Sequence, residues 1–135
     1  MKVWDTMLQD STYRIWTKEF NPGSYYVGSW DKGSEIKFVG LDEKGLLQGM
    51  YSRIKENRLH QFVSVEHVGI VENGIIDTTS EKVKKWAPSF ENYSFIKEGD
   101  GTLLLIEMQI DSEYKAMFEE MWERALKALK VLCEK

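Results

Sequence analysis

Cysteine and proline are scarce in this sequence of 135 residues, which contains one of the first and two of the second. The single cysteine, Cys133, excludes an intrachain disulfide, so we expect a reducing compartment. No apolar run approaches the ~20 residues that span a bilayer, so no integral membrane association is expected. The opening MKVWDTMLQ lacks the apolar middle and small-residue cleavage site of a signal peptide. The sequence therefore favours a cytoplasmic protein.

Potential metal ligands and catalytic nucleophiles are also few. His60, His67 and Cys133 are the only soft ligands, and none forms a tight pair at zinc-like spacing. No nucleophile elbow is present, and Cys133 falls in the last turn of an expected helix without an obvious base. We assign no catalytic residue, no metal and no cofactor.

The charge balance argues against nucleic acid as a partner. The net charge is −4, whereas phosphate binding needs clustered Lys and Arg. The basic run EKVKKW at 81–86 is short and fits a solvated face. The length suits one compact domain over residues 1–135, and 13% aromatic residues must line a core or a site.

Hydrophobic periodicity divides the chain into helices at both ends and strands between them. KVWDTMLQ (2–9) and DSTYRIWTKEF (10–20) have helical spacing, with Asp10 and Ser11 as expected caps. Period-two segments then fill 24–110, apart from one helical turn expected in 80–90. Glycines inside these strands, at 28, 40, 49 and 69, indicate bulges or close backbone approach in a strongly bent sheet. Turns are expected at Lys32-Gly33, Glu43–Gly45, Asn57-Arg58, Asn73-Gly74 and Gly99–Gly101.

The last segment, which runs from the caps Asp111 and Ser112 to the end of the chain and contains YKAMFEEMWERALKALKVL, predicts an amphipathic helix roughly 35 Å long. Asp111 and Ser112 are its expected caps, and Glu120–Arg124 and Glu123–Lys127 its expected surface pairs. Its apolar stripe must be buried, and the sheet is the expected partner, which gives an α+β fold with helices on one face. The stripe consists of Tyr114, Met117, Phe118, Met121, Trp122, Ala125, Leu126, Leu129, Leu132 and Cys133.

Several stretches together resemble a bacterial member of the START-like (SRPBCC) superfamily, in the branch named after the activator of Hsp90 ATPase. They are KVWDTML, Trp16, GSWDKGSEIKF, VEHVGIVENG, FENYSF followed by GDGTLLLIEM, and FEEMWERALKALK. The resemblance implies a helix-grip (Bet v 1/START-like) fold, in which a curved antiparallel sheet wraps a long C-terminal helix and leaves a cavity. Relatives usually carry a strand before the KVWD-type helix. Either Met1 is not the native start, which we favour, or the sheet lacks a strand, which would favour a homodimer over a monomer.

Relatives of this kind bind lipids, sterols or polyketides, and some are cyclases or hydrolases. The resemblance thus implies binding of a small hydrophobic or amphipathic ligand between sheet and helix, without catalysis. A co-chaperone-like protein-interaction module and a cyclase or hydrolase using the same cavity are the alternatives. Core packing is the favoured alternative for each single candidate lining residue. These candidates are Tyr13, Trp16, Phe20, Trp30, Phe38, Tyr51, Phe62, His67, Trp86, Tyr93, Met108, Met117, Met121 and Trp122.

His67 is the candidate polar anchor or general base. It alternates with Val63 and Val65, although the segment LHQFVSVEHVGIV is apolar on both alternations and its facing stays open. A structural histidine, or one on the outer face, is the favoured alternative. Glu66 cannot pair with it, because adjacent strand residues face opposite sides. Glu107 is expected on the solvent side.

Overall fold

The computed structural model describes residues 2–21, 23–109 and 115–134 and has an α+β fold: a curled antiparallel sheet, two short N-terminal helices and a C-terminal helix. Two compact units compose it, Met1–Tyr25 with Ile110–Lys135, and Tyr26–Gln109. The fold class predicted from the sequence is confirmed. The elements are α1 (Lys2–Leu8), α2 (Asp10–Trp16), a 3-10 turn η1 (Thr17–Glu19), β1 (Tyr25–Gly28), β2 (Glu35–Leu41), β3 (Leu47–Arg58), β4 (Phe62–Glu72), β5 (Ile75–Asp77), α3 (Glu81–Lys84), β6 (Ser89–Glu98), β7 (Gly101–Met108) and α4 (Lys115–Cys133).

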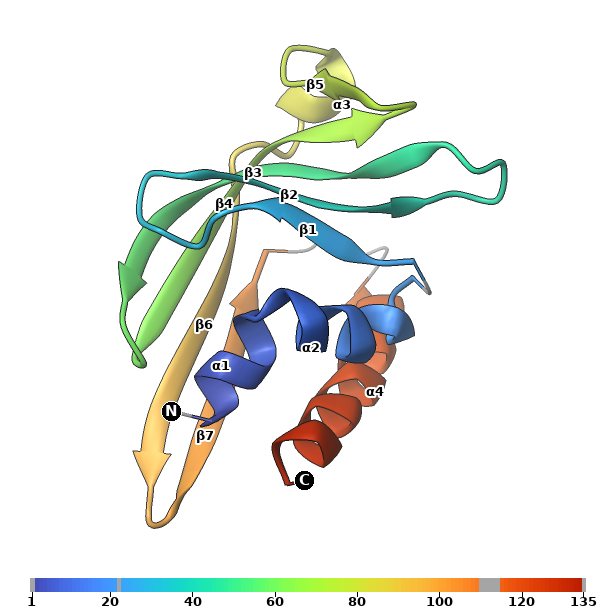
Figure 1. Ribbon diagram of the computed structural model, residues 1–135. Helices are drawn as coiled ribbons and strands as arrows, with labels where there is room; N and C mark the ends of the chain where they lie inside the picture. The colour runs from blue at the N-terminus through green and yellow to red at the C-terminus, as the bar shows by residue number, and fades with distance from the viewer. Residues whose placement is uncertain (1, 22, 110–114, 135) are drawn as a thin grey trace. The chain divides into compact units, whose positions relative to one another are not determined.

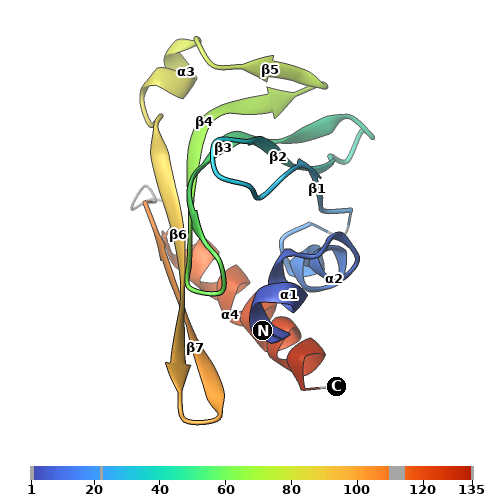
Figure 2. The ribbon, with the colours of Figure 1, turned by 60° about the vertical axis from the view of Figure 1, so that its left-hand side comes forward.

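The sheet is strongly bent, as the strand glycines indicated. Its strand order is β1-β2-β3-β4-β6-β7. The short strand β5 pairs with the last residues of β4, after the part of β4 that pairs with β6. Figure 1 and Figure 2 show β2 running across the direction of the β6–β7 hairpin, with β3 and β4 curving between them. Register shifts in the β3–β4 ladder, between Tyr51 and Ser52 and between Ile54 and Glu56, contribute to this bend.

One face of the sheet is much more buried than the other. In β4, Val63, Val65 and His67 are buried, whereas Phe62 and Glu66 on the other face are half-buried and only the small Ser64 is buried among these neighbours. The strand registers carry this face across the sheet, and we call it the His67 face. It answers the question of facing that the sequence left open. By these registers its members are Ile36, Phe38, Gln48, Met50, Ser52, Ile54, Asn57, Val63, Val65, His67, Ile70, Glu72, Ser89, Glu91, Tyr93, Phe95, Lys97, Thr102, Leu104, Ile106 and Met108.

The edge strand β7 alternates in the same way. Leu104, Ile106 and Met108 are half-buried, whereas Leu105 and Glu107 are exposed. The predicted solvent-facing position of Glu107 is therefore confirmed.

Most hairpin turns fall where the sequence predicts them. Asn73 and Gly74 both have positive φ, 53° and 75°, as a type I′ turn requires. The turn predicted at Asn57-Arg58 is wrong by about two residues, because both residues remain paired, with Val63 and Phe62. The chain reverses instead at 59–61, where His60 has a φ of 64°.

A close approach between strands explains one strand glycine in detail. Gly49 has a φ of 156°, and a Cβ there would overlap the carbonyl oxygen of Phe38 and lie 2.8 Å from the Cα of Val39. No other residue fits this position without moving the neighbouring backbone.

In the helical unit, α1 has nearly the predicted extent, whereas α2 ends at Trp16 and the 3-10 turn η1 continues it to Glu19. The predicted cap of α2 is wrong. Gln9 is the N-cap, and its side chain makes no capping bond. Asp10 lies inside the helix and pairs with Arg14 at 3.0 Å.

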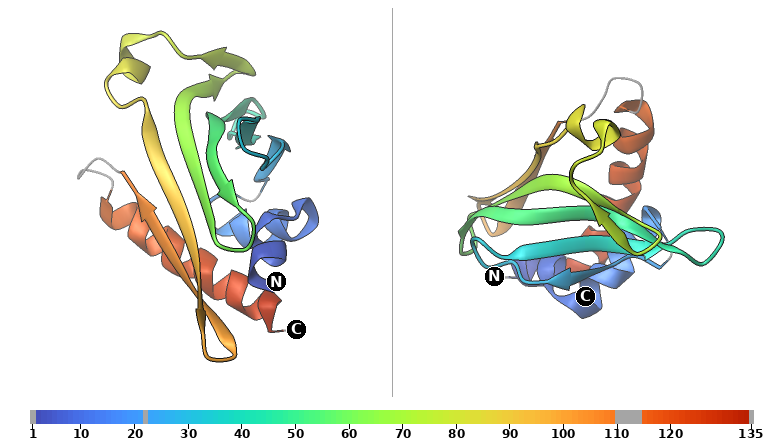
Figure 3. Two further views of the ribbon diagram at one scale, coloured as in Figure 1. Left: turned by 90° about the vertical axis from the view of Figure 1, so that its left-hand side faces the viewer. Right: turned by 90° about the horizontal axis from the view of Figure 1, so that it is seen from above.

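The C-terminal helix α4 is a single rod (Figure 3) of 19 residues, or about 28 Å. The expected caps Asp111 and Ser112 and the stripe residue Tyr114 lie outside the described residues, so the predicted start of the helix stays a prediction. The Glu120–Arg124 and Glu123–Lys127 pairs are present, at 2.8 and 3.4 Å. The helix contacts α1, α2 and η1.

Candidate functional site

A chain of hydrogen-bonded polar side chains crosses the His67 face. Ser52 Oγ lies 2.7 Å from His67 Nδ1, and His67 Nε2 lies 3.4 Å from Glu91 Oε1. The hydroxyl of Tyr93 donates to Glu91 Oε2. The residues come from three neighbouring strands, β3, β4 and β6, and the register that places Ser52 opposite His67 brings them together.

Burial fixes the roles of the groups in this chain. Ser52 has no exposed surface, and the side chains of His67 and Glu91 are 11% and 14% exposed. An ionised carboxylate can only accept hydrogen bonds, so Nε2 of His67 carries the proton that faces Glu91. In the neutral ring, Nδ1 then accepts from the Ser52 hydroxyl. Glu91 is thus held by two donors and remains the most accessible of the three.

Aromatic rings continue from this polar chain. The Phe38 ring meets the His67 ring edge-on, with centroids 6.1 Å apart, and Trp30 lies 5.5 Å from Phe38. Tyr26 extends the series at 5.4 Å from Trp30. Phe38 and several aliphatic members of the face retain accessible surface, so the polar groups are set in an apolar wall that is only partly covered. The half-buried aliphatic members include Met50, Leu104, Ile106 and Met108.

Ser52, His67 and Glu91 have the composition of a hydrolytic triad, but their placement does not suit nucleophilic catalysis. A nucleophile must reach its substrate, and Ser52 has no exposed surface. It also lies within the paired part of β3 rather than on a sharp turn. The arrangement is better suited to holding the carboxylate of Glu91 in one orientation.

The sequence-predicted residues of the sheet fall on both faces. Phe38, His67, Tyr93 and Met108 belong to the His67 face, and Trp30 packs on Phe38.

Tyr51 and Phe62 lie on the opposite face. The side-chain hydrogen bond of Tyr51 with Glu35, together with partial desolvation, raises the pKa of its phenol above the ordinary 10.0. The Arg58 guanidinium lies 4.9 Å from the centre of the Phe62 ring. Trp86 is half-buried beyond α3.

The predicted residues of the helical unit form an aromatic cluster of their own. Trp122 lies 6.0 Å from Trp16 and 5.0 Å from Phe20, and Tyr13 lies 5.4 Å from Trp16. The indole N–H of Trp16 donates to the carbonyl of Met7 at 3.1 Å. These four rings pack α2 and η1 on α4 and act as core. In the same unit Met121 is half-buried, and Met117 is 50% exposed.

Ser52 and Glu91 were missed by the sequence reasoning. They lie 15 and 24 residues from His67, and only the pairing register brings them beside it. The adjacent Glu66 was correctly excluded as a partner, because it lies on the other face. A serine and a glutamate in strands carry no local signal that could have identified them.

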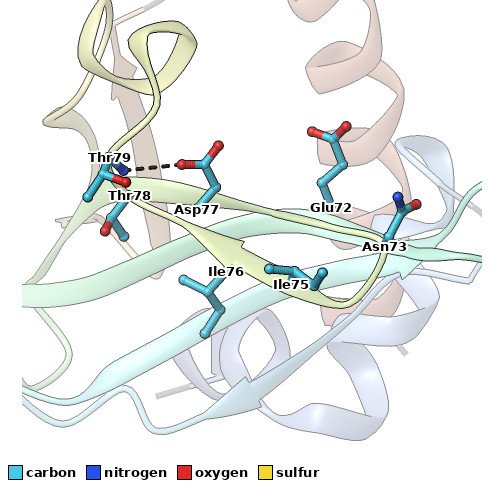
Figure 4. A pocket seen from close by; sticks show the side chains of 7 residues that line it. All are labelled: Glu72, Asn73, Ile75, Ile76, Asp77, Thr78 and Thr79. Atoms are coloured by element: carbon cyan, nitrogen blue, oxygen red, sulfur yellow. Dashed lines mark hydrogen bonds between the residues drawn. The ribbon is translucent and has the colours of Figure 1, made fainter.

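A hollow of about 450 Å³ lies beside the β4–β5 hairpin (Figure 4). Asp77 Oδ1 accepts from the backbone N–H groups of Thr79 and Ser80 at 3.1 and 3.0 Å. Glu72 pairs with Lys82 at 2.8 Å. Both carboxylates thus serve the local turn and helix, and Ile75 at the rim is 70% exposed. We regard this hollow as a feature of the hairpin and not as a binding site.

Residues 2–21, 23–109 and 115–134 contain no group of three or more His, Cys, Asp or Glu side chains that could hold a metal ion. None of the helices in these ranges has the length and apolar character needed to cross a bilayer.

Comparison with known proteins identifies the fold alone. No family model matches the chain, and no curated protein does. A protein from Cytophaga hutchinsonii is similar in structure, with a TM-score of 0.67 and 16% identity over 98% of this chain and 84% of its own. The chain is similar to the same degree to an uncharacterised protein from Rhizobium leguminosarum, with a TM-score of 0.65 and 14% identity over 98% of this chain and 84% of that protein. For a protein from Nitrosomonas europaea the TM-score is 0.65 and the identity 15%, over 98% of this chain and 85% of that protein. At these identities the likeness establishes a shared architecture over nearly the whole chain.

Proposed function

We propose that this protein binds a small, mostly apolar molecule bearing one polar group, and that it does so on the His67 face without catalysis. The observation that carries the proposal is the Glu91 carboxylate, oriented by two donors and set in a partly exposed apolar wall. Small-molecule sites are typically apolar with a few polar groups that fix orientation. The START-like resemblance of the sequence and the shared architecture support the same conclusion, as does the cytoplasmic location expected from the sequence.

A binding role is favoured over a hydrolase or cyclase role by the burial of Ser52. His67 has both ring nitrogens engaged, with Ser52 and with Glu91. A general base needs a free nitrogen within reach of substrate. The polar chain therefore supports recognition of a ligand better than transfer of a proton.

Two half-buried phenylalanines on opposite faces provide a matched test. Phe38 belongs to the His67 face, and Phe62 to the other. Truncating a phenylalanine that contacts a ligand should cost roughly 1.5–3 kcal/mol of apolar contact, or about tenfold or more in affinity. We expect Phe38→Ala to weaken binding of a fluorescent apolar probe by this factor and Phe62→Ala to leave it unchanged.

Native mass spectrometry of the purified protein complements this titration. A retained small molecule, lost on extraction, would support the proposal. Equal effects of the two variants, or no binding of any apolar probe at saturating concentrations, would refute it.

A protein-contact role is a second candidate, favoured by the outer face of the β6–β7 hairpin. Ile96 and Leu103 are directly paired there, and with Leu105 they are 45%, 48% and 43% exposed. Neighbouring exposed apolar residues of this kind often mark an interaction surface. If this surface joins two copies of the chain, Leu103→Glu should convert a dimer to a monomer in sedimentation experiments. If it contacts a chaperone, the variant should lose stimulation of the chaperone's ATPase activity. A monomeric wild type without any stimulation would remove this candidate.

A further inference from the structure

We infer that the polar group recognised on the His67 face is a hydrogen-bond donor, a hydroxyl or an ammonium, and that amphiphiles ending in a carboxylate are disfavoured. The inference rests on the proposed function and goes on to specify the chemical class of the ligand.

The first step is the hydrogen-bond capacity of Glu91. A carboxylate has about four acceptor sites on its two oxygens. His67 Nε2 occupies one site on Oε1, and the Tyr93 hydroxyl occupies one on Oε2. Each oxygen therefore keeps acceptor capacity, and the side chain is 14% exposed. Glu91 can therefore still accept a hydrogen bond from a donor group of a ligand.

The second step is the use of the neighbouring donors. The Ser52 hydroxyl is directed to His67 Nδ1, and the Nε2 proton and the Tyr93 hydroxyl are directed to Glu91. A ligand carboxylate would need one of these protons, and taking it would leave a buried partner unsatisfied. This set of hydrogen-bonded side chains thus offers acceptor atoms to a ligand, while its own donor groups are already engaged with one another.

The third step concerns charge. By the strand registers Lys97 is the basic member of the His67 face, but it is exposed and lies six residues along β6 from Glu91, or about 20 Å away. A second carboxylate near Glu91 would add a like charge in a partly desolvated position, where the cross-strand partners of Glu91 are Val65 and Met108 and supply no cation. An ammonium would complement the charge of Glu91, and a neutral hydroxyl would donate to it without repulsion.

The test compares three amphiphiles with the same ten-carbon tail, decanol, decylamine and decanoate, in displacement of a fluorescent apolar probe at neutral pH. Decanol and decylamine can each donate a charge-assisted hydrogen bond to Glu91, whereas decanoate is repelled by it. We therefore expect decanol and decylamine to bind about tenfold or more tightly than decanoate. Glu91→Gln, which replaces one acceptor oxygen by a donor amide, should reduce this difference severalfold by improving decanoate binding. Retention of the near-UV circular dichroism spectrum serves as the folding control for the variant.

The outcomes separate the two proposals. Decanoate binding as tightly as decanol to the wild type overturns the donor inference and leaves the proposed binding function intact. Binding of none of the three overturns the proposed function, and the inference with it. If Glu91→Gln does not fold, the order of the three ligands on the wild type still decides the matter. A salt-sensitive preference for decylamine over decanol would identify an ammonium, and similar affinities would identify a hydroxyl; either result supports the inference.

Discussion

The hydroxyl oxygen of Ser52 lies 2.7 Å from Nδ1 of His67, across two neighbouring strands and without exposure of the serine to solvent. A buried imidazole requires partners for both nitrogens, because an unsatisfied buried polar group costs about 1–3 kcal/mol. Ser52 supplies one partner and Glu91 the other. The Ser52–His67 hydrogen bond therefore fixes the orientation of the His67 ring, and this orientation determines where Glu91 is held.

Ser52→Ala should lower the free energy of unfolding by about 1–3 kcal/mol, since Nδ1 of His67 loses its donor. Urea denaturation followed by circular dichroism measures the change. Ser94→Ala is the matched control, because Ser94 is half-buried on the opposite face, and its effect should stay within about 0.5 kcal/mol. Equal effects of the two substitutions would contradict the structural role assigned to the Ser52–His67 bond.

Gly49→Ala should destabilise the protein by about 1–3 kcal/mol or more, because the added Cβ meets the backbone of the adjacent strand in a φ region that favours glycine. Thermal unfolding measures the loss. At Gly101 the nearest atom to an added Cβ is 3.6 Å away, an ordinary contact, so Gly101→Ala should be close to neutral. A silent Gly49→Ala would show that β2 and β3 separate more easily than their close approach implies.

The sequence predicted the elements far better than the site. Asn73-Gly74, the period-two segments and the amphipathic spacing of the terminal helix are local signals, and each of them placed an element correctly. The facing of β4 was open because residues 62–71 are apolar on both alternations, and only the register with β3 and β6 decides it. Glu91 became a partner of His67 through the same register, which no local pattern encodes.

The α2 cap shows a second limit of local reasoning. Asp10 is a good capping residue by type, but the helix begins at Asp10 itself, where its carboxylate pairs with Arg14. The aromatic residues raised a similar ambiguity. Trp16 and Trp122 were candidates for a ligand site with core packing as the favoured alternative, and they are found packed together in the helical unit.

The contact between Phe20 and Trp122 should be measurable as a coupling energy. Their ring centroids lie 5.0 Å apart in an edge-to-face arrangement. A double-mutant cycle with Phe20→Leu and Trp122→Leu should give about 0.5–1.5 kcal/mol of favourable coupling beyond the two single effects. A cycle between Trp122 and the exposed Val131, nine residues and so about 13 Å along α4, should give additivity within about 0.5 kcal/mol. Additivity in the Phe20–Trp122 cycle would contradict direct ring contact.

The raised pKa of Tyr51 gives a prediction for alkaline solution. The phenol donates to Glu35, and this bond, partial desolvation and the nearby carboxylate charge all favour its protonated form, raising the pKa above 10.0. Because the pKa is higher in the folded state than in the unfolded state, the associated stability is present below pH 10 and is lost as pH rises through the folded-state pKa. Glu35→Ala should therefore lower the Tyr51 pKa toward 10.0, as followed by NMR of the labelled ring. The loss of folding stability caused by Glu35→Ala should become smaller at pH values above the folded-state pKa of Tyr51. Glu43→Ala, at an exposed turn, should leave the titration unchanged. A Tyr51 that titrates identically in wild type and Glu35→Ala would mean that the hydrogen bond between the two side chains does not form in solution.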